Sequence, residues 1–299
     1  MIKQPPYLKK GDKIAIVCPA RKLRTDITAA LSLLEEWGLV VIEGKSVHAQ
    51  YHQFAGDDQL RAEDIQIFLD NPDIKAVIAA RGGYGTVRII DDLDFSMFNK
   101  SPKWIVGFSD ITVLLSHLTN ALNIQSIHGQ MLGSFAKGTA KSLETLRKAL
   151  FGEDLFYTCE HHDLNRRGEA KGILIGGNLS ILISLEGSVS QMDYNDKILF
   201  LEDVGEREYA IDRMLRMLKR SGKLAGLKGL IIGAFTEIEA EDIPYGETVE
   251  QLILEIVKEY DYPVCFGFPV GHIQDNQALV LGKTTRLIVD QQRTSLNYV

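Results

Sequence analysis

Cysteine is scarce in this sequence: the 299 residues include only Cys18, Cys159 and Cys265. The three cysteines lie far apart, their number is odd, and no CxxC pair or other metal-ligand spacing occurs. Disulfide scaffolds and structural zinc sites both depend on clustered or regularly spaced cysteines. The sequence therefore predicts neither a disulfide framework nor a metal site.

Long apolar segments and an excess of positive charge are also missing. No apolar run reaches the roughly 18 residues that span a bilayer, and the N-terminal stretch "MIKQPPYLKKGDKIAIVCPA" has no long apolar core. Lys and Arg total 33 against 40 Asp and Glu, a net charge of -7, whereas nucleic-acid binding needs clustered positive charge. We therefore expect a cytoplasmic protein that binds neither nucleic acid nor membrane.

The first half of the chain alternates short β-branched runs with amphipathic segments. Strands are predicted at residues 13–18, 39–42, 75–80, 104–106 and 124–127, and helices at residues 27–37, 60–69, 86–90 and 111–122. Alternating strands and helices are typical of βαβ units. The pattern predicts an α/β fold with a doubly wound parallel sheet and helices on both faces.

The composition changes after residue 150. Residues 151–168 are polar and lack a clean period, so we interpret them as a connector between an N-terminal domain (1–150) and a C-terminal domain (169–299). The later segment has predicted strands at residues 172–175, 198–201, 230–235, 278–281 and 286–289, and helices at residues 179–185, 209–219 and 249–260. This order predicts a smaller, mixed α/β domain.

Two loops follow neighbouring predicted strands of the first half. "RGGYG" (residues 81–85) follows the third strand and "GFSD" (residues 107–110) follows the fourth. Ligands of open α/β sheets bind beyond the carboxyl ends of the strands. The glycine-rich loop lacks the Walker GK[ST] and the GxGxxG pattern, so it could hold a phosphate, supply oxyanion-binding N–H groups, or form a tight turn.

"GFSDIT" resembles a nucleophile elbow but departs from GxSxG, because Ile111 stands where the second glycine would be. Ser109 or Asp110 could also cap the following helix, and the local sequence alone favours this capping role.

The second half supplies candidates for the other members of a catalytic triad. Glu202 ends a predicted strand in "KILFLEDVGERE", and His272 follows "FGFPVG". Ser109, Glu202 and His272 could form a Ser–Glu–His relay, although a lone acid or histidine is more often structural. His128 follows the fifth strand, where a structural role and a place in the crevice are both open.

Seven segments together resemble the LD-carboxypeptidase family of serine peptidases, which includes muramoyl-tetrapeptide carboxypeptidases and microcin C immunity peptidases. These segments are "KKGDKIAIVCPA", "NPDIKAVIAARGGYG", "KWIVGFSDIT", "HGQM", "GILIGGNLSIL", "ILFLEDVGEREYAIDRML" and "GFPVGH". The resemblance covers nearly the whole chain. It implies a flavodoxin-like N-terminal domain that carries the serine and a C-terminal domain that carries the glutamate and histidine.

The resemblance also implies the roles of individual residues. Ser109 would be the nucleophile, His272 the general base and Glu202 the residue that orients His272. The backbone N–H groups of Gly83 and Asp110 would form the oxyanion hole. The implied reaction needs no cofactor or metal: it hydrolyses the amide bond between an L-centre and a C-terminal D-amino acid. For the tetrapeptidase branch, this reaction releases D-alanine from murein tetrapeptide in cell-wall recycling, and family likeness suggests a homodimer.

Substrate recognition remains open at this stage. Arg81 or Arg207 could hold the free carboxylate of the substrate, or each could simply form an ion pair. The stretch Cys18-Pro19-Ala20-Arg21 stands where small and hydroxyl residues usually follow the first strand in the family. If this loop borders the substrate, Arg21 or Lys22 could alter which substrates fit. Two alternatives remain: a microcin C immunity-type peptidase that cleaves aminoacyl nucleotide conjugates, and a non-catalytic two-lobed binding protein that uses "RGGYG" as a phosphate nest.

Overall fold

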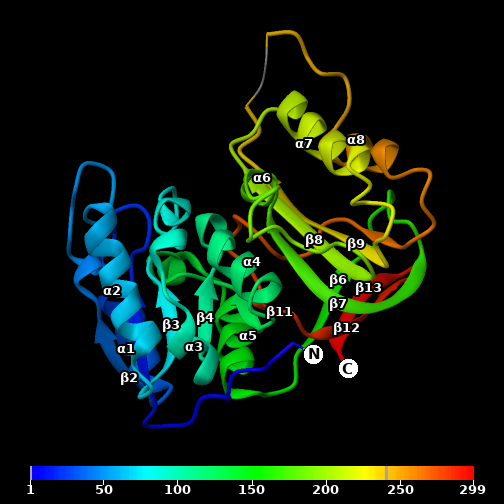
Figure 1. The fold of residues 1–299 in the computed structure, drawn as a ribbon. Helices are drawn as coiled ribbons and strands as arrows, with labels where there is room; N and C mark the ends of the chain where they lie inside the picture. Colours follow the sequence, from blue (N-terminus) through cyan, green and yellow to red (C-terminus); the bar gives the residue numbers. More distant parts are fainter. Residues whose placement is uncertain (1, 240–241) are drawn as a thin grey trace.

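The computed structural model describes residues 2–239 and 242–299, which form two α/β lobes (Figure 1). The first lobe is built on a six-stranded sheet with helices α1–α5, and the second on a seven-stranded sheet with helices α6–α8. None of the helices within the described residues has both the length and the hydropathy that crossing a bilayer would require.

The first sheet has the strand order β11-β5-β4-β3-β1-β2. Strands β1 to β5 are parallel, and β11 pairs with β5 in the antiparallel direction. Its strands are β1 (Lys13–Val17), β2 (Val40–Glu43), β3 (Ile74–Ala79), β4 (Trp104–Gly107), β5 (Ser126–His128) and β11 (Leu279–Leu281). The parallel order with crossover helices confirms the predicted doubly wound sheet.

Helices cover both faces of the first sheet. Successive residues of β1 point to opposite faces: Ile14 and Ile16 pack in one hydrophobic core, and Ala15 and Val17 pack in the other. Helices α1 and α5 contribute to the first of these cores, and α2, α3 and α4 to the second. The α-helices are α1 (Thr28–Glu36), α2 (Asp58–Asp70), α3 (Ser96–Lys100), α4 (Thr112–Asn120) and α5 (Ala140–Phe151).

Short 3-10 helices connect several of these elements. They are η1 (Lys45–Val47), η2 (Thr86–Arg88), η3 (Ile90–Asp92), η4 (Ser109–Ile111) and η5 (Leu132–Lys137). Helix η2 follows the glycine-rich loop after β3, and η4 follows β4. Both loops predicted to carry function therefore lie at the carboxyl edge of the first sheet.

The second sheet has the strand order β10-β9-β8-β7-β12-β13-β6. Strands β7 to β10 are parallel, whereas β12, β13 and β6 continue the sheet in antiparallel pairs. Its strands are β6 (Phe156–Glu160), β7 (Gly168–Asn178), β8 (Lys197–Val204), β9 (Gly229–Thr236), β10 (Val264–Cys265), β12 (Thr284–Val289) and β13 (Arg293–Tyr298). This mixed sheet agrees with the predicted second α/β unit.

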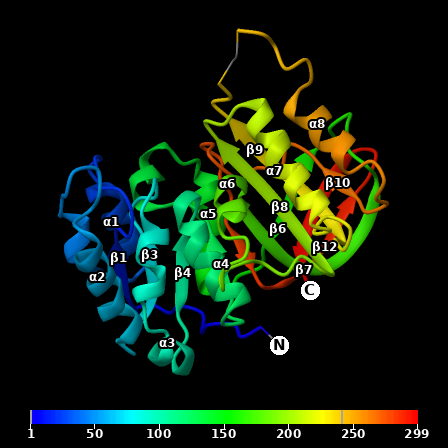
Figure 2. The ribbon, with the colours of Figure 1, turned by 45° about the horizontal axis from the view of Figure 1, so that its top comes forward.

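The two faces of the second sheet have different partners. Helices α6 (Leu179–Ser184), α7 (Glu208–Arg220) and α8 (Val249–Ile256) share a hydrophobic core with one face (Figure 2). Leu174 and Phe200, on the other face, belong to the same core as Leu118 of α4. One continuous hydrophobic core therefore joins the lobes.

Two segments considered in the sequence have a different place in the fold from the one expected. The predicted strand at residues 278–281 becomes β11 and joins the first sheet, although it comes late in the chain. The expected connector at residues 151–168 contains β6, which pairs with β13. Both strands lie at sheet edges, where their partners are distant in sequence, so local periodicity does not reveal their pairing.

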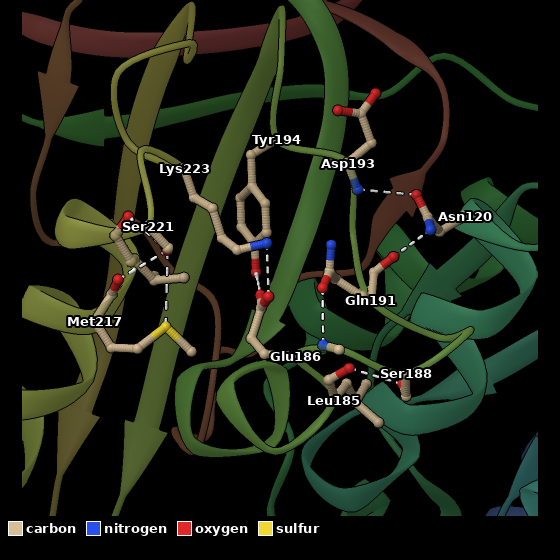
Figure 3. Close-up of polar contacts among 12 residues, drawn as sticks. Asn120, Leu185, Glu186, Ser188, Gln191, Asp193, Tyr194, Met217, Ser221 and Lys223 are labelled. Atoms are coloured by element: carbon tan, nitrogen blue, oxygen red, sulfur yellow. Dashed lines mark hydrogen bonds and ion pairs between the residues drawn. The ribbon is translucent and has the colours of Figure 1, made fainter.

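The loop at residues 185–196 fastens the second lobe to α4. The backbone N–H of Asp193 donates to Asn120 Oδ1 (2.9 Å), and the Asn120 amide donates to the carbonyl of Gln191 (Figure 3). The Ser116 hydroxyl donates to the carbonyl of Ser190 (2.6 Å). We call these five residues the interlobe latch, and it holds the helix that follows Ser109 against the second lobe.

Candidate active site

Ser109 lies on a sharp turn between β4 and α4. It is the first residue of η4 and has a φ of 62°, a left-handed conformation that residues with a side chain rarely adopt. The N-caps of η4 and α4 are Phe108 and Ile111, and neither makes a side-chain capping hydrogen bond. The local sequence favoured a helix-capping role for Ser109 or Asp110, and neither residue caps the following helix in the structure.

Glycines allow other atoms to approach this turn closely. A Cβ atom at Gly107 would lie 2.7 Å from Ile111 Cγ2, so only glycine lets η4 pack against the end of β4. A Cβ atom at Gly82 would lie 3.2 Å from the Cβ of Ser109. The glycine-rich loop therefore lies directly against Ser109. This agrees with the prediction that the two loops follow neighbouring strands.

Gly83 lies in the middle of that loop with a φ of 110°. Neither its backbone N–H nor that of Asp110 donates to an acceptor within residues 2–239 and 242–299. Free N–H groups on two adjoining loops beside a serine are the arrangement that binds a developing oxyanion.

Glu202 and His272 form the second half of the site. Glu202 is buried near the carboxyl end of β8, and its Oε2 lies 2.6 Å from His272 Nδ1. Burial, the largest single effect, lowers the pKa of His272, but the hydrogen bond and the charge of Glu202 outweigh it. The net result is a pKa above the ordinary value. The carboxylate of Glu202 therefore favours the protonated form of the imidazole.

The lobes meet at Phe108 and His272. The ring of Phe108, the residue before Ser109, lies edge-on to the imidazole with the ring centroids 4.9 Å apart. Within the described part of the chain, no hydrogen bond joins the Ser109 hydroxyl to His272. The structure thus pairs Glu202 with His272 and brings His272 against the residue next to Ser109.

A cavity of about 480 Å³ opens beside His272, between the lobes. It is lined by Phe108, Gln130, Ser134, Lys137, Val204, Glu237, His272, Ile273 and Gln274. Lys137 and Glu237 are not among the residues that the sequence predicts. Glu237 directly follows β9, and this position after a strand end is the only signal in the sequence that could have identified it.

The two arginines considered for the substrate carboxylate do not line this cavity. Arg81 Nη1 donates to the carbonyl of Lys22 (2.8 Å), and Arg207 pairs with Glu239 (3.2 Å). Arg21 lies against the glycine loop, because a Cβ atom at Gly83 would come within 2.5 Å of its Cδ. Arg21, which belongs to the stretch that departs from the family pattern, therefore lies next to the candidate active site.

His128 is fully buried behind the site. Its ring lies between the rings of Phe108 and Phe200, at centroid distances of 5.8 and 4.9 Å. Burial lowers the pKa of His128 to about 4, so the imidazole is neutral at physiological pH. Of the two roles that the sequence left open for His128, the structural role fits this position.

No cluster of three metal-ligating side chains occurs within residues 2–239 and 242–299.

Comparison with known proteins identifies the family. A family model described as the LD-carboxypeptidase N-terminal domain matches residues 14–129, and a model of the LD-carboxypeptidase C-terminal domain matches residues 171–287. The probable murein peptide carboxypeptidase of Bacillus subtilis (strain 168) is 36% identical over 291 residues, covering 93% of this chain and 89% of that protein.

Solved structures agree with this assignment. The crystal structure of muramoyltetrapeptide carboxypeptidase from Oxalobacter formigenes is 32% identical, with a TM-score of 0.87 over 96% of this chain and 98% of that one. The microcin C7 self-immunity protein MccF, in complex with aspartyl sulfamoyl adenosine, shares the fold with a TM-score of 0.88 and 21% identity, over 100% of this chain and 99% of that one. Both family models and full-length relatives match, so the chain belongs to the LD-carboxypeptidase family and is a serine-type LD-carboxypeptidase.

Proposed function

We propose that the enzyme releases D-alanine from murein tetrapeptide with a triad of Ser109, His272 and Glu202. The observation that carries the proposal is the 2.6 Å contact between buried Glu202 and His272, with the imidazole against the residue that precedes Ser109. The substrate is supported by the relatives, two of which are named as carboxypeptidases of murein peptide and of muramoyltetrapeptide.

The first chemical step is attack by Ser109 Oγ on the carbonyl carbon of the scissile amide. His272 Nε2 accepts the serine proton, and Glu202 stabilises the resulting imidazolium through Nδ1. The same proton then passes to the leaving amine of D-alanine. Water hydrolyses the acyl-enzyme, with His272 again as the base, and frees the tripeptide.

The oxyanion of each tetrahedral intermediate is proposed to bind the N–H groups of Gly83 and Asp110. Each such donor typically contributes about 3–4 kcal/mol to transition-state stabilisation. The Gly83 loop and the Ser109 turn follow adjacent strands, β3 and β4, so the sheet itself sets their spacing. This arrangement requires no group from outside the chain.

The proposal extends to the organisation of the protein. Residues 1–150 and 169–299 are proposed as the two domains, and neither should hydrolyse substrate alone, because Ser109 and His272 lie in different ones. We further propose that the enzyme acts in the cytoplasm during cell-wall recycling, as a homodimer. Size-exclusion chromatography with light scattering tests the dimer.

Mass spectrometry of murein tetrapeptide incubated with the purified enzyme tests the substrate. The expected products are tripeptide and free D-alanine. An aminoacyl-sulfamoyl adenosine serves as the competing substrate, because the alternative is an immunity-type peptidase. Faster cleavage of the nucleoside conjugate than of the tetrapeptide would overturn the proposed substrate.

A further inference from the structure

The carboxylate of Asp110 joins the two loops that flank the nucleophile. Its Oδ2 accepts hydrogen bonds from the backbone N–H of Thr86 (2.9 Å) and from the Thr86 hydroxyl (2.6 Å). Asp110 and Thr86 are both buried, and Oδ1 of Asp110 has no partner within the described residues. Burying a carboxylate with an unsatisfied oxygen costs stability, so folding alone does not explain this choice of residue.

Arg61 of α2 fixes the same loop from its other side. Its guanidinium is fully buried, which is uncommon for arginine. Nη1 donates to the carbonyl of Gly85 (3.0 Å) and to that of Pro19, and Nη2 pairs with Asp58. The carbonyl of Gly82, at the start of the loop, accepts from the backbone of Arg21 (3.3 Å).

These contacts leave one part of the loop without a protein partner. The backbone is held at Gly82, Gly85 and Thr86, whereas the N–H of Gly83, between them, donates to no described acceptor. The other proposed donor is the backbone N–H of Asp110, whose own side chain holds Thr86. The adjacency of β3 and β4 sets the approximate spacing of the two donors, and the contact between Asp110 and Thr86 fixes the two loops to each other.

We infer that Thr86 and Arg61 are positioning residues that preorganise the oxyanion hole. The inference rests on the proposed function, because that function assigns the hole to Gly83 and Asp110. Neither side chain touches the reacting atoms. Because a preorganised hole acts on the transition state more than on the bound substrate, loss of the contact lowers kcat rather than raising KM.

The test compares Thr86→Val with Thr86→Ser in the full chain. Valine keeps the shape but removes the hydroxyl that donates to Asp110. We expect kcat to fall about tenfold, which corresponds to about 1.4 kcal/mol, with KM changed less than about twofold. Serine restores the donor, and kcat should return to within about twofold of the parent value.

Thr119→Val is the matched control. Thr119 is buried on α4, and its hydroxyl has no partner within the described residues. The control removes the same hydroxyl group but does not affect the glycine-rich loop, so kcat should match the parent value.

If Thr86→Val does not fold, Asp110→Asn takes its place. This variant weakens the contact with Thr86 but keeps the backbone N–H of residue 110, so kcat should again fall with KM unchanged.

A second readout separates this inference from the proposed substrate. The rate at which a fluorophosphonate modifies Ser109 also depends on the oxyanion hole, but not on recognition of the peptide. Labelling of the parent without release of D-alanine would defeat the proposed function and leave the inference testable. Unchanged kcat and labelling rate in Thr86→Val, or a rise in KM alone, would overturn the inference.

Discussion

Ser109 combines the proposed nucleophile with a backbone conformation that costs free energy. Its φ of 62° lies in the left-handed region, where a residue with a Cβ atom is destabilised by about 1–2 kcal/mol. Strain of this kind is retained where the surrounding structure fixes the residue for a task. The close approach of Gly82 and Gly107 supplies that constraint here.

This strain predicts an order of stability among inactive variants. Ser109→Gly should be more stable than Ser109→Ala by about 1 kcal/mol, because glycine tolerates the left-handed backbone but gains entropy in the unfolded chain. Chemical denaturation measures the free energy of unfolding of both. At Ser101, where φ is -133°, the glycine variant should be no more stable than the alanine variant. If the glycine variant were more stable than the alanine variant at both Ser109 and Ser101, the result would contradict backbone strain at Ser109.

As the proposed general base, His272 should set the pH dependence of the reaction. The imidazole acts as a base only when neutral, and Glu202 raises its pKa above the ordinary value of about 6.5. Activity should therefore be lost as the pH falls through this raised pKa. The sign for folding is opposite: protonated His272 stabilises the native state at low pH, and this contribution disappears as the pH rises through the same pKa.

Glu202→Gln should lower kcat by about 10²- to 10⁴-fold and move the midpoint of the acidic limb of kcat/KM to lower pH. The amide cannot stabilise the imidazolium by charge. Glu237→Gln is the control, because Glu237 affects His272 by charge and forms no hydrogen bond with it within the described residues. The midpoint in this variant should move less. A midpoint that does not move in Glu202→Gln would contradict the assigned orienting role.

At the scale of elements, the interlobe latch connects a helix of one lobe to a loop of the other. Asn120, at the end of α4, both donates and accepts across the interface, and α4 begins three residues after Ser109. The Glu186–Lys223 ion pair (2.6 Å) and the Tyr194 hydroxyl that donates to Glu186 (3.1 Å) lie entirely within the second lobe (Figure 3). These two sets of contacts can be varied separately.

Asn120→Ala should lower the free energy of unfolding by about 1–3 kcal/mol, because it removes two hydrogen bonds that join the lobes, one of them partly buried. It should also lower kcat/KM, since Ser109 and His272 then meet across a looser interface. Lys223→Met, the control, should affect stability while kcat/KM stays at the parent value. Equal losses of kcat/KM in the two variants would show that the latch has no specific effect on the site.

At the scale of the whole molecule, one hydrophobic core runs through both lobes. Leu118 of α4 and Leu279 of β11 belong to the same core as Leu174 and Phe200 of the second sheet. The chain also returns from the second lobe to the first, because β11, which comes late in the sequence, forms an edge strand of the first sheet. The placement of His272 relative to Ser109 is therefore a property of the complete fold.

The sequence predicted those features that depend on local pattern. The apolar runs of the first half became parallel strands because buried strands must be apolar, and Ser109 lies at the predicted corner because Gly107 ends β4. Contacts between distant residues left no such pattern. The pairing of Glu202 with His272, 70 residues apart, was one possibility that their positions near predicted strand ends left open, and only the family resemblance assigned the two residues their roles.

The side-chain contacts of Arg61 and Asp110 were also missed, for a physical reason. Arg61 reads as an ordinary residue of an amphipathic helix, and only the folded chain shows that its guanidinium is enclosed by the loops after β1 and β3. The contact between Asp110 and Thr86 likewise depends on the adjacency of β3 and β4. Buried polar side chains form hydrogen bonds with groups that are distant in sequence, and the local sequence pattern does not identify those partners.

The most direct test of the account is the release of D-alanine from murein tetrapeptide by the parent enzyme and by Ser109→Ala. The substitution removes only the attacking oxygen, so circular dichroism and substrate binding should be preserved. We expect release to fall by about 10³-fold or more. Unchanged release by a folded Ser109→Ala variant would contradict the claim that Ser109 is the nucleophile.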